Sequence, residues 1–333
     1  MIGQPLIASY DAALFDLDGV IYLGPEPVPG AAEGLAAIRE LGTKVGFVTN
    51  NAARTPVSVA EHLRDLGIEA QTSDVVTSAQ AGAHLLRQRF GAGAKVLVVG
   101  GGGIWAALAE AELTGVRSAD DDPVAIIQGW STDLTWQQLN EAAVAIHRGA
   151  HWLATNTDLT RPTDRGIVPG NGAAVAAVRV AVDVEPEVAG KPFRPLFDET
   201  IERLGVQNPI FVGDRIDTDI GGAVGLDIDS MMVLTGAHGA AELLAATPAE
   251  RPTYLGWNVG ALLEPALTAR VDGDEATCAG TRVRAVDGQL VLLGRPRGRS
   301  QRVAALWAAA TLAWTYVDAD RALDHDALVR ALA

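Results

Sequence analysis

The sequence has 333 residues, 48% of them hydrophobic and 20% charged, which at roughly 100–200 residues per domain predicts two or three globular domains. With 26 Lys and Arg against 41 Asp and Glu, the net charge is −15, which repels phosphate backbones and argues against nucleic-acid binding. The single cysteine, Cys278, can form neither an internal disulfide nor a multi-cysteine metal site. No basic segment precedes an apolar core at the N-terminus, and no apolar run reaches the ~20 residues of a membrane helix. We therefore expect a cytoplasmic protein without a membrane partner.

Short apolar runs alternate with stretches of helical spacing in the first part of the chain. They predict a strand over 12–15, a helix over 31–41, a strand over 45–48 and a helix over 56–66. This alternation predicts a parallel sheet covered by helices, and such sheets bind ligands at the carboxyl ends of their strands. Asp16 and Thr49 both stand at such ends.

A second set of the same kind begins near Ser78. Its strands are expected over 95–99, 124–128 and 152–154, and its helices over 104–113, 135–148 and 172–182. Further strands are expected over 210–212 and 230–234. The predicted α/β fold is a Rossmann-like parallel-sheet core (1–77 plus 187–260) with an inserted α/β cap domain (78–186). The alternative, two sequential domains, would leave Asp214 far from Asp16.

The pattern changes after Leu263. Segments 281–285 and 289–293 flank a short turn that is typical of a β-hairpin. An Arg-rich loop over 295–299 precedes a helix expected over 302–316. We expect 264–333 to form a small C-terminal α+β domain of unknown role, with little core of its own.

Two carboxylates, Asp16 and Asp18, follow the first predicted strand. Side chains at positions i and i+2 point to the same side, and Gly19 permits a tight turn. Adjacent carboxylates repel each other unless a cation is bound or one of them keeps a proton. The pair therefore suits a divalent ion such as Mg²⁺ or a general acid, and a solvated pair in a turn is the alternative.

Three more acids, Asp214, Asp217 and Asp219, follow the strand expected over 210–212. On their own they would be read as a turn leading into a helix, where the helix dipole favours Asp. Beside Asp16 and Asp18, they would instead complete an oxygen-rich cation site.

Three residues could hold an anion. Thr49 and Asn50 supply a hydroxyl and an amide just beyond a strand, where backbone N–H groups also point outward. Lys191 is the only lysine after Lys95, and a buried phosphate in so acidic a protein would need such a charge.

These stretches match, in order, the four motifs of the haloacid dehalogenase-like phosphatases. The motifs are Asp16-x-Asp18-Gly-Val, Thr49-Asn50, Gly190-Lys191-Pro192 and Gly213-Asp214-x5-Asp219. Segments 16–30 and 154–173 further resemble the NagD-type, 4-nitrophenyl-phosphatase-like branch. That branch has a large α/β cap inserted between the second and third motifs, as predicted above.

The resemblance implies a role for each matching residue. Asp16 would attack phosphorus and form an aspartyl-phosphate, and Asp18 would act as general acid and base. Mg²⁺ would be held by Asp16, by the main-chain carbonyl of Asp18 and by Asp214, with Asp219 in support. Thr49, Asn50 and Lys191 would hold the phosphoryl oxygens.

The family places its substrate-selecting loop after the strand expected over 152–154. Arg161 and Asp158 are the candidates there, and Arg54 is a weaker one; a solvated loop is the alternative. The expected substrate is a small phosphorylated metabolite, preferentially glycerol 3-phosphate. Phosphoglycolate, a sugar phosphate, pyridoxal phosphate or a nucleotide remain open, because the four motifs recognise only the shared phosphate.

Two segments favour functions of a different class. Gly101-x-Gly103, after a strand and before a helix, is typical of dinucleotide binding and would suit an NAD(P)-dependent oxidoreductase. The loop Arg295–Ser300 faintly resembles part of a GCN5-related N-acetyltransferase. Acyl-CoA binding, an interdomain contact or a homodimer contact are its open interpretations.

Overall fold

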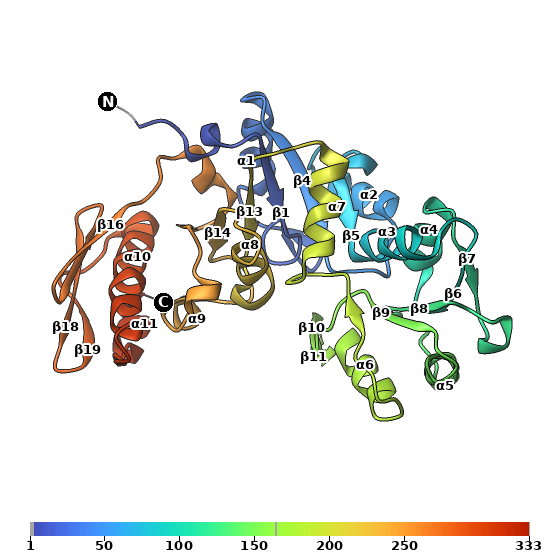
Figure 1. The fold of residues 1–333 in the computed structure, drawn as a ribbon. Coiled ribbons are helices and arrows are strands. Elements are labelled where there is room, and N and C mark those ends of the chain that lie inside the picture. The colour runs from blue at the N-terminus through green and yellow to red at the C-terminus, as the bar shows by residue number, and fades with distance from the viewer. Residues whose placement is uncertain (1–2, 164, 333) are drawn as a thin grey trace. The chain divides into compact units, whose positions relative to one another are not determined.

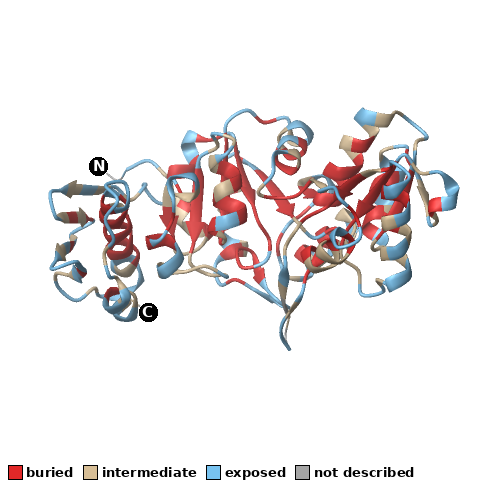
Figure 2. Ribbon diagram, turned by 60° about the horizontal axis from the view of Figure 1, so that its bottom comes forward, coloured by how far each residue is buried: buried red, intermediate tan, exposed pale blue. Residues whose placement is uncertain are grey.

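The computed structural model describes residues 3–163 and 165–332, and the chain divides into two compact units. The first unit combines Met1–Val45 with Asn208–Ala333, and the second is Gly46–Gln207 (Figure 1). In both units the central strands are buried (Figure 2). Among the described helices, none is both long enough and apolar enough to cross a membrane.

The first unit is built on a parallel sheet in which β15, β14, β13 and β1 pair in that order. All four residues of β1 are buried, as expected for a parallel strand that is covered on both faces. The elements of this unit are β1 (Ala12–Phe15), β2 (Tyr22–Leu23), β3 (Glu26–Pro27), α1 (Ala31–Glu40), β13 (Pro209–Gly213), a π-helical turn (Ile216–Ile220), α8 (Gly221–Val224), β14 (Ser230–Val233), α9 (Ala240–Leu244), β15 (Tyr254–Gly256), β16 (Ala269–Asp272), β17 (Glu275–Cys278), β18 (Thr281–Val286), β19 (Gln289–Leu292), α10 (Gly298–Val317) and α11 (Asp326–Leu332).

Strand β13 pairs directly with β1, with Phe15 opposite Val212. The predicted return of the chain to its first strand is thereby confirmed. Because the two strands are parallel, the residues that follow them, Asp16 and Asp214, emerge at the same edge of the sheet.

The C-terminal segment is an antiparallel meander, β16 to β19, against which α10 packs. Helix α10 is buried over most of its length because apolar groups cover it on more than one side (Figure 2). Its Trp307 and Leu312 belong to the same apolar cluster as Met232 and Leu243 of the parallel-sheet region. The meander and the parallel sheet thus share one core.

The second unit contains β4, which begins at the boundary and pairs in parallel with β5, and a separate parallel sheet in the order β12, β9, β8, β6, β7. Its elements are β4 (Lys44–Thr49), α2 (Pro56–Asp65), β5 (Val75–Thr77), α3 (Ser78–Phe90), β6 (Lys95–Val99), α4 (Gly102–Glu110), β7 (Thr114–Val116), β8 (Ala125–Gln128), α5 (Trp136–His147), β9 (His151–Ala154), β10 (Thr160–Thr163), β11 (Gly166–Pro169), α6 (Asn171–Arg179), β12 (Glu187–Val188) and α7 (Arg194–Leu204).

Helices cover both faces of this five-stranded sheet. Helices α5 and α6 pack on one face, in a cluster that includes Ile126 and Trp152. On the other face α3 approaches closely, because Gly82 lies where a Cβ would be 2.9 Å from Leu153 and 3.1 Å from Ile127. Strands buried on both faces explain the continuous apolar runs in this part of the sequence.

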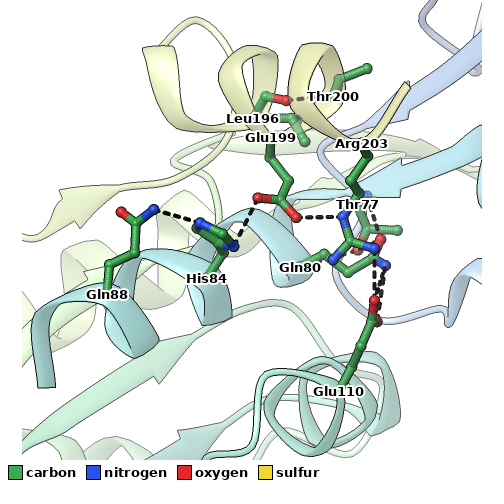
Figure 3. Close-up of polar contacts among 9 residues, drawn as sticks. All are labelled: Thr77, Gln80, His84, Gln88, Glu110, Leu196, Glu199, Thr200 and Arg203. Carbon is green, nitrogen blue, oxygen red and sulfur yellow. Dashed lines mark hydrogen bonds and ion pairs between the residues drawn. The ribbon is translucent and has the colours of Figure 1, made fainter. Parts of the chain in front are cut away.

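A polar network joins α3, α4 and α7 around a buried carboxylate, that of Glu199 (Figure 3). His84 Nδ1 lies 3.3 Å from Glu199, and Arg203 pairs with both Glu199 and Glu110, the latter at 2.7 Å. Burial alone would lower the pKa of Arg203, but its two carboxylate partners raise it above its ordinary value. A buried carboxylate with two such partners holds α7 against α3, and α7 begins just after Lys191.

Most of the predicted elements are present, with differences at a few places. The polar loop expected after β9 includes a short hairpin, β10 with β11. Helix α10 begins at Gly298 and so takes in part of the Arg-rich loop. The predicted hairpin over 281–293 is confirmed, with Asp287 and Gly288 both at positive φ in the turn. Strands β16 and β17 were not expected, because their charged residues weaken the strand pattern.

Candidate active site

Three carboxylates gather where β1 and β13 end. One oxygen from each of Asp16, Asp214 and Asp219 lies within 4.8 Å of the others. Asp214 and Asp219 are buried and Asp16 is 8% exposed, whereas Asp18 is exposed. Buried carboxylates at this spacing repel one another unless a cation neutralises them, so this group suits a divalent cation with oxygen ligands.

Asp214 is held in place by the segment after β14. Its Oδ2 accepts the Ala237 N–H at 2.5 Å, and its main-chain carbonyl accepts the His238 N–H at 3.2 Å. A Cβ at Gly236 would lie 1.9 Å from Oδ2, and a Cβ at Gly19 would lie 2.4 Å from the same atom. Glycine is required at both positions because the carboxylate fills the space that a side chain would occupy.

Asp219 and Asp217 differ in their surroundings. Asp219 Oδ2 accepts the N–H groups of Asp214 and Arg215, at 3.2 and 3.1 Å, so it braces the loop that carries Asp214. Asp217 pairs instead with the Arg215 guanidinium at 2.6 Å. Burial alone would raise the pKa of Asp217, but Arg215 lowers it below its ordinary range. Asp217 thus lies outside the acidic cluster.

In the second unit, Thr49 and Lys191 are both buried. Thr49 ends β4, and its hydroxyl accepts the Asn51 N–H at 3.1 Å, which shapes the turn after the strand. The Lys191 Nζ is 3.5 Å from the Val48 carbonyl. A buried lysine at a strand end suits an anionic ligand.

Asn50 contacts both Lys191 and Asp158, which lies in the predicted substrate-selecting loop of the cap (called the cap loop below). Its Oδ1 accepts the Lys191 N–H at 2.7 Å, and its Nδ2 donates to the Lys191 carbonyl at 3.1 Å. The same Nδ2 is 3.3 Å from the Asp158 carboxylate. Thr49, Asn50, Asp158 and Lys191, which the sequence singled out from three distant segments, are therefore linked within this unit.

Arg161, on β10, stacks on a residue that the sequence did not single out. Its guanidinium carbon lies 3.9 Å from the centre of the Trp130 ring, a cation–π arrangement. Trp130 also lines a cavity of about 860 Å³ together with Ala53 and the glycine-rich turn after β6. Arg54, the weaker sequence candidate, is exposed on the loop before α2.

The glycine-rich turn follows a strand and precedes α4, as a dinucleotide fingerprint would. The group that packs closely against it, however, is the protein's own main chain. The Gly103 N–H donates to the Ala53 carbonyl at 3.1 Å, and a Cβ at position 103 would be 2.4 Å from the Ala52 carbonyl oxygen. Gly103 therefore leaves room for the main chain of Ala52 and Ala53, and it gives no support to dinucleotide binding.

In the Arg-rich loop, the Arg299 guanidinium lies 4.5 Å from the centre of the Trp257 ring. This contact links the start of α10 to the region after β15. It gives that arginine a packing partner, and the acyl-CoA interpretation stays a prediction.

Several residues of the site were missed by reasoning from the sequence. Thr235, whose hydroxyl donates to the Gly19 carbonyl at 2.7 Å, and Gly236 follow β14. The rule used for Asp16 and Asp214, that functional groups follow parallel strands, would have found them. Asn156 and Trp130 likewise follow β9 and β8, but no charge marked them out.

The fold and the acidic cluster together define the class of protein. A family model described as haloacid dehalogenase-like hydrolase matches residues 13–114, and a HAD-hydrolase-like model matches residues 188–262. The chain belongs to the haloacid dehalogenase-like hydrolases. The resemblance seen in the sequence is thereby confirmed.

Individual relatives refine this assignment. The chain is 45% identical over 259 residues to a D-glycerol 3-phosphate phosphatase of Mycobacterium tuberculosis, covering 78% of this chain and 72% of that one. It is 37% identical to an acid sugar phosphatase of Staphylococcus epidermidis over 229 residues, which are 68% of this chain and 87% of the relative.

Solved structures agree. The crystal structure of a glycerol phosphate phosphatase from M. tuberculosis in complex with magnesium has a TM-score of 0.87 and 37% identity, covering 99% of this chain and 98% of that one. A p-nitrophenyl phosphatase from Archaeoglobus fulgidus has a TM-score of 0.71 and 28% identity, covering 76% and 98%. The predicted α/β class and the likeness to the 4-nitrophenyl-phosphatase branch are confirmed.

Proposed function

We propose that this chain is a Mg²⁺-dependent phosphomonoesterase whose first candidate substrate is D-glycerol 3-phosphate. The observation that carries the proposal is the cluster of Asp16, Asp214 and Asp219 beyond two paired parallel strands. The relatives that are glycerol phosphate phosphatases support the substrate. The acid sugar phosphatase supports sugar phosphates as the second candidate.

Three carboxylate oxygens within 4.8 Å fit Mg²⁺, a hard cation that prefers oxygen ligands. Asp16 and Asp214 would bind it with the main-chain carbonyl of Asp18, and Asp219 would orient the Asp214 loop. When bound, the ion supplies positive charge that offsets the repulsion between Asp16 and a phosphate dianion.

The residues divide the reaction between them. The Asp16 carboxylate attacks phosphorus as the bond to the leaving oxygen breaks, which forms an aspartyl-phosphate. Asp18 donates a proton to that leaving oxygen, and it then takes a proton from the water that hydrolyses the intermediate. In this proposal Thr49 and Lys191 stabilise the charge on the phosphoryl oxygens, and Arg161 is the candidate for binding the leaving group.

Hydrolysis of 4-nitrophenyl phosphate in MgCl₂ tests the proposal. Asp16→Asn removes the nucleophile and is expected to abolish turnover, while Asp217→Asn, the same change in an acid outside the cluster, is expected to keep it. EDTA is expected to stop the wild-type reaction and added Mg²⁺ to restore it. An Asp16→Asn rate within tenfold of the wild type, or a rate insensitive to EDTA, would overturn the proposal.

A further inference from the structure

Asn50 makes a two-way contact with the main chain of Lys191. One side-chain atom accepts the Lys191 N–H at 2.7 Å and the other donates to the Lys191 carbonyl at 3.1 Å. Since both hydrogen bonds must stay aligned, the contact fixes the main chain on both sides of the Lys191 Cα. A Cβ at Gly190 would lie 2.6 Å from Asn50 Oδ1, so the glycine before Lys191 makes the approach possible.

The other contacts of Asn50 come from the cap loop and from α3. Its Nδ2 lies 3.3 Å from Asp158 Oδ2, and its main-chain carbonyl accepts from Asn156 Nδ2 and from Ser78 Oγ, each at 2.7 Å. An amide nitrogen carries two hydrogens, and here they face the Lys191 carbonyl and the Asp158 carboxylate. The side-chain donors of Asn50 are thus committed to protein groups.

We propose that Asn50 and Asp158 are positioning residues that act on the substrate through Lys191, an inference that rests on the proposed function. Asp158 orients the Asn50 amide, and the amide holds the backbone from which the Lys191 side chain projects. Lys191 binds the phosphoryl group, which every substrate shares. Disturbing the pair is therefore expected to lower kcat by a similar factor for different leaving groups.

Exchanging the amide of Asn50 and the carboxylate of Asp158 tests whether the two residues act together on Lys191. In Asn50→Asp, an oxygen replaces Nδ2 and faces both the Asp158 carboxylate and the Lys191 carbonyl, so a loss of about 100-fold in kcat is expected. In Asp158→Asn, the new amide still presents an oxygen to Asn50, and a loss below about threefold is expected. The double variant again pairs a carboxylate with an amide, so it is expected to recover at least fivefold over Asn50→Asp.

Asn140→Asp is the matched control, because it makes the same change at an exposed position on α5. It is expected to stay within twofold of the wild type, and thermal unfolding shows that each variant is folded. A double variant no faster than Asn50→Asp, or an Asn50→Asp kcat within threefold of the wild type, would overturn the inference.

A second readout uses two substrates, 4-nitrophenyl phosphate and D-glycerol 3-phosphate. In Asp158→Asn, the ratio of their kcat/KM values is expected to stay within about threefold of the wild-type ratio. A tenfold change in this ratio would show that Asp158 contacts the leaving group instead. Asp16→Asn separates the two proposals. If Asp16→Asn is inactive while the double variant is no faster than Asn50→Asp, the phosphatase assignment stands and only the positioning role fails.

Discussion

Gly236 lies so close to the Asp214 carboxylate that a Cβ atom at position 236 would be 1.9 Å from Oδ2. The neighbouring Ala237 N–H donates to the same oxygen. Gly236 and Ala237 therefore help to fix the position of Asp214, although neither carries a charged side chain.

Gly236→Ala is expected to displace Asp214 and to lower kcat about 100-fold, because misplacing a catalytic group by an ångström costs about that much. The Mg²⁺ concentration that gives half-maximal rate is expected to rise. Gly239→Ala is the control, since the nearest atom to a Cβ there is Glu242 Oε2 at 3.9 Å. Equal activity of the two variants with 4-nitrophenyl phosphate would contradict this role of Gly236.

The stack of Arg161 on Trp130 predicts an effect on substrate choice. Trp130→Leu removes the ring that holds the guanidinium, and a stack of this kind stabilises by about 0.5–2 kcal/mol. The kcat/KM for D-glycerol 3-phosphate is expected to fall about tenfold relative to that for 4-nitrophenyl phosphate. Trp136→Leu, at a ring that is 72% exposed, is expected to leave the ratio unchanged. A ratio that stays unchanged in Trp130→Leu as well would argue against a role for Arg161 at the leaving group.

Tyr10 predicts a loss of stability at alkaline pH. Burial and the hydrogen bonds to Asp229 (2.6 Å) and Tyr254 (3.1 Å) raise the pKa of Tyr10 well above its ordinary value. Because the folded-state pKa exceeds the unfolded one, this stabilisation is complete below about pH 10 and is lost as the pH rises further.

Tyr10→Phe is expected to cost about 1–2 kcal/mol in the free energy of unfolding at pH 7, since it removes the donor of a partly buried hydrogen bond to the Asp229 carboxylate. The difference in the free energy of unfolding between Tyr10→Phe and the wild type is expected to shrink between about pH 10 and 11.5. Urea unfolding across that range measures it. A difference independent of pH would show that the phenolic proton is not the cause.

The shared core of the first unit predicts that the C-terminal segment contributes to stability. Trp314, on α10, donates to the Leu243 carbonyl at 3.0 Å and meets Trp307 edge-on at 5.5 Å. Trp314→Ala is expected to lower the free energy of unfolding by about 3–5 kcal/mol. Trp136→Ala is expected to change it by less than about 0.5 kcal/mol. Similar small effects in the two variants would mean that α10 packs without stabilising the sheet.

Much of the candidate site could be predicted because its chemistry sits in short motifs. Asp214 and Lys191 each directly follow a glycine, and Asp16 directly follows a buried strand and stands three residues before Gly19. A glycine near a charged group indicates that the backbone approaches closely there. Trp130 and Asn156 could not be predicted, because a tryptophan or an asparagine after a strand is common and only its partner makes it relevant.

The shared core of α10 also lay beyond the sequence pattern. Its apolar residues run almost all around the helix, which indicates burial but does not identify the covering surface. That surface is divided between the meander and the region of β14 and α9, which lie far apart in sequence.

By itself, the sequence determined many of the strands and helices, the acidic and lysine motifs and the family, because these depend on local periodicity and on residue types at fixed spacing. Only the tertiary structure decided which side chains meet: that Asp219 joins the cluster while Asp217 pairs with Arg215, that Gly103 receives the chain's own loop, and that Asn50 holds Lys191. Hydrogen bonds and ion pairs act over a few ångströms, and the backbone path that sets those distances arises from the packing of the whole chain.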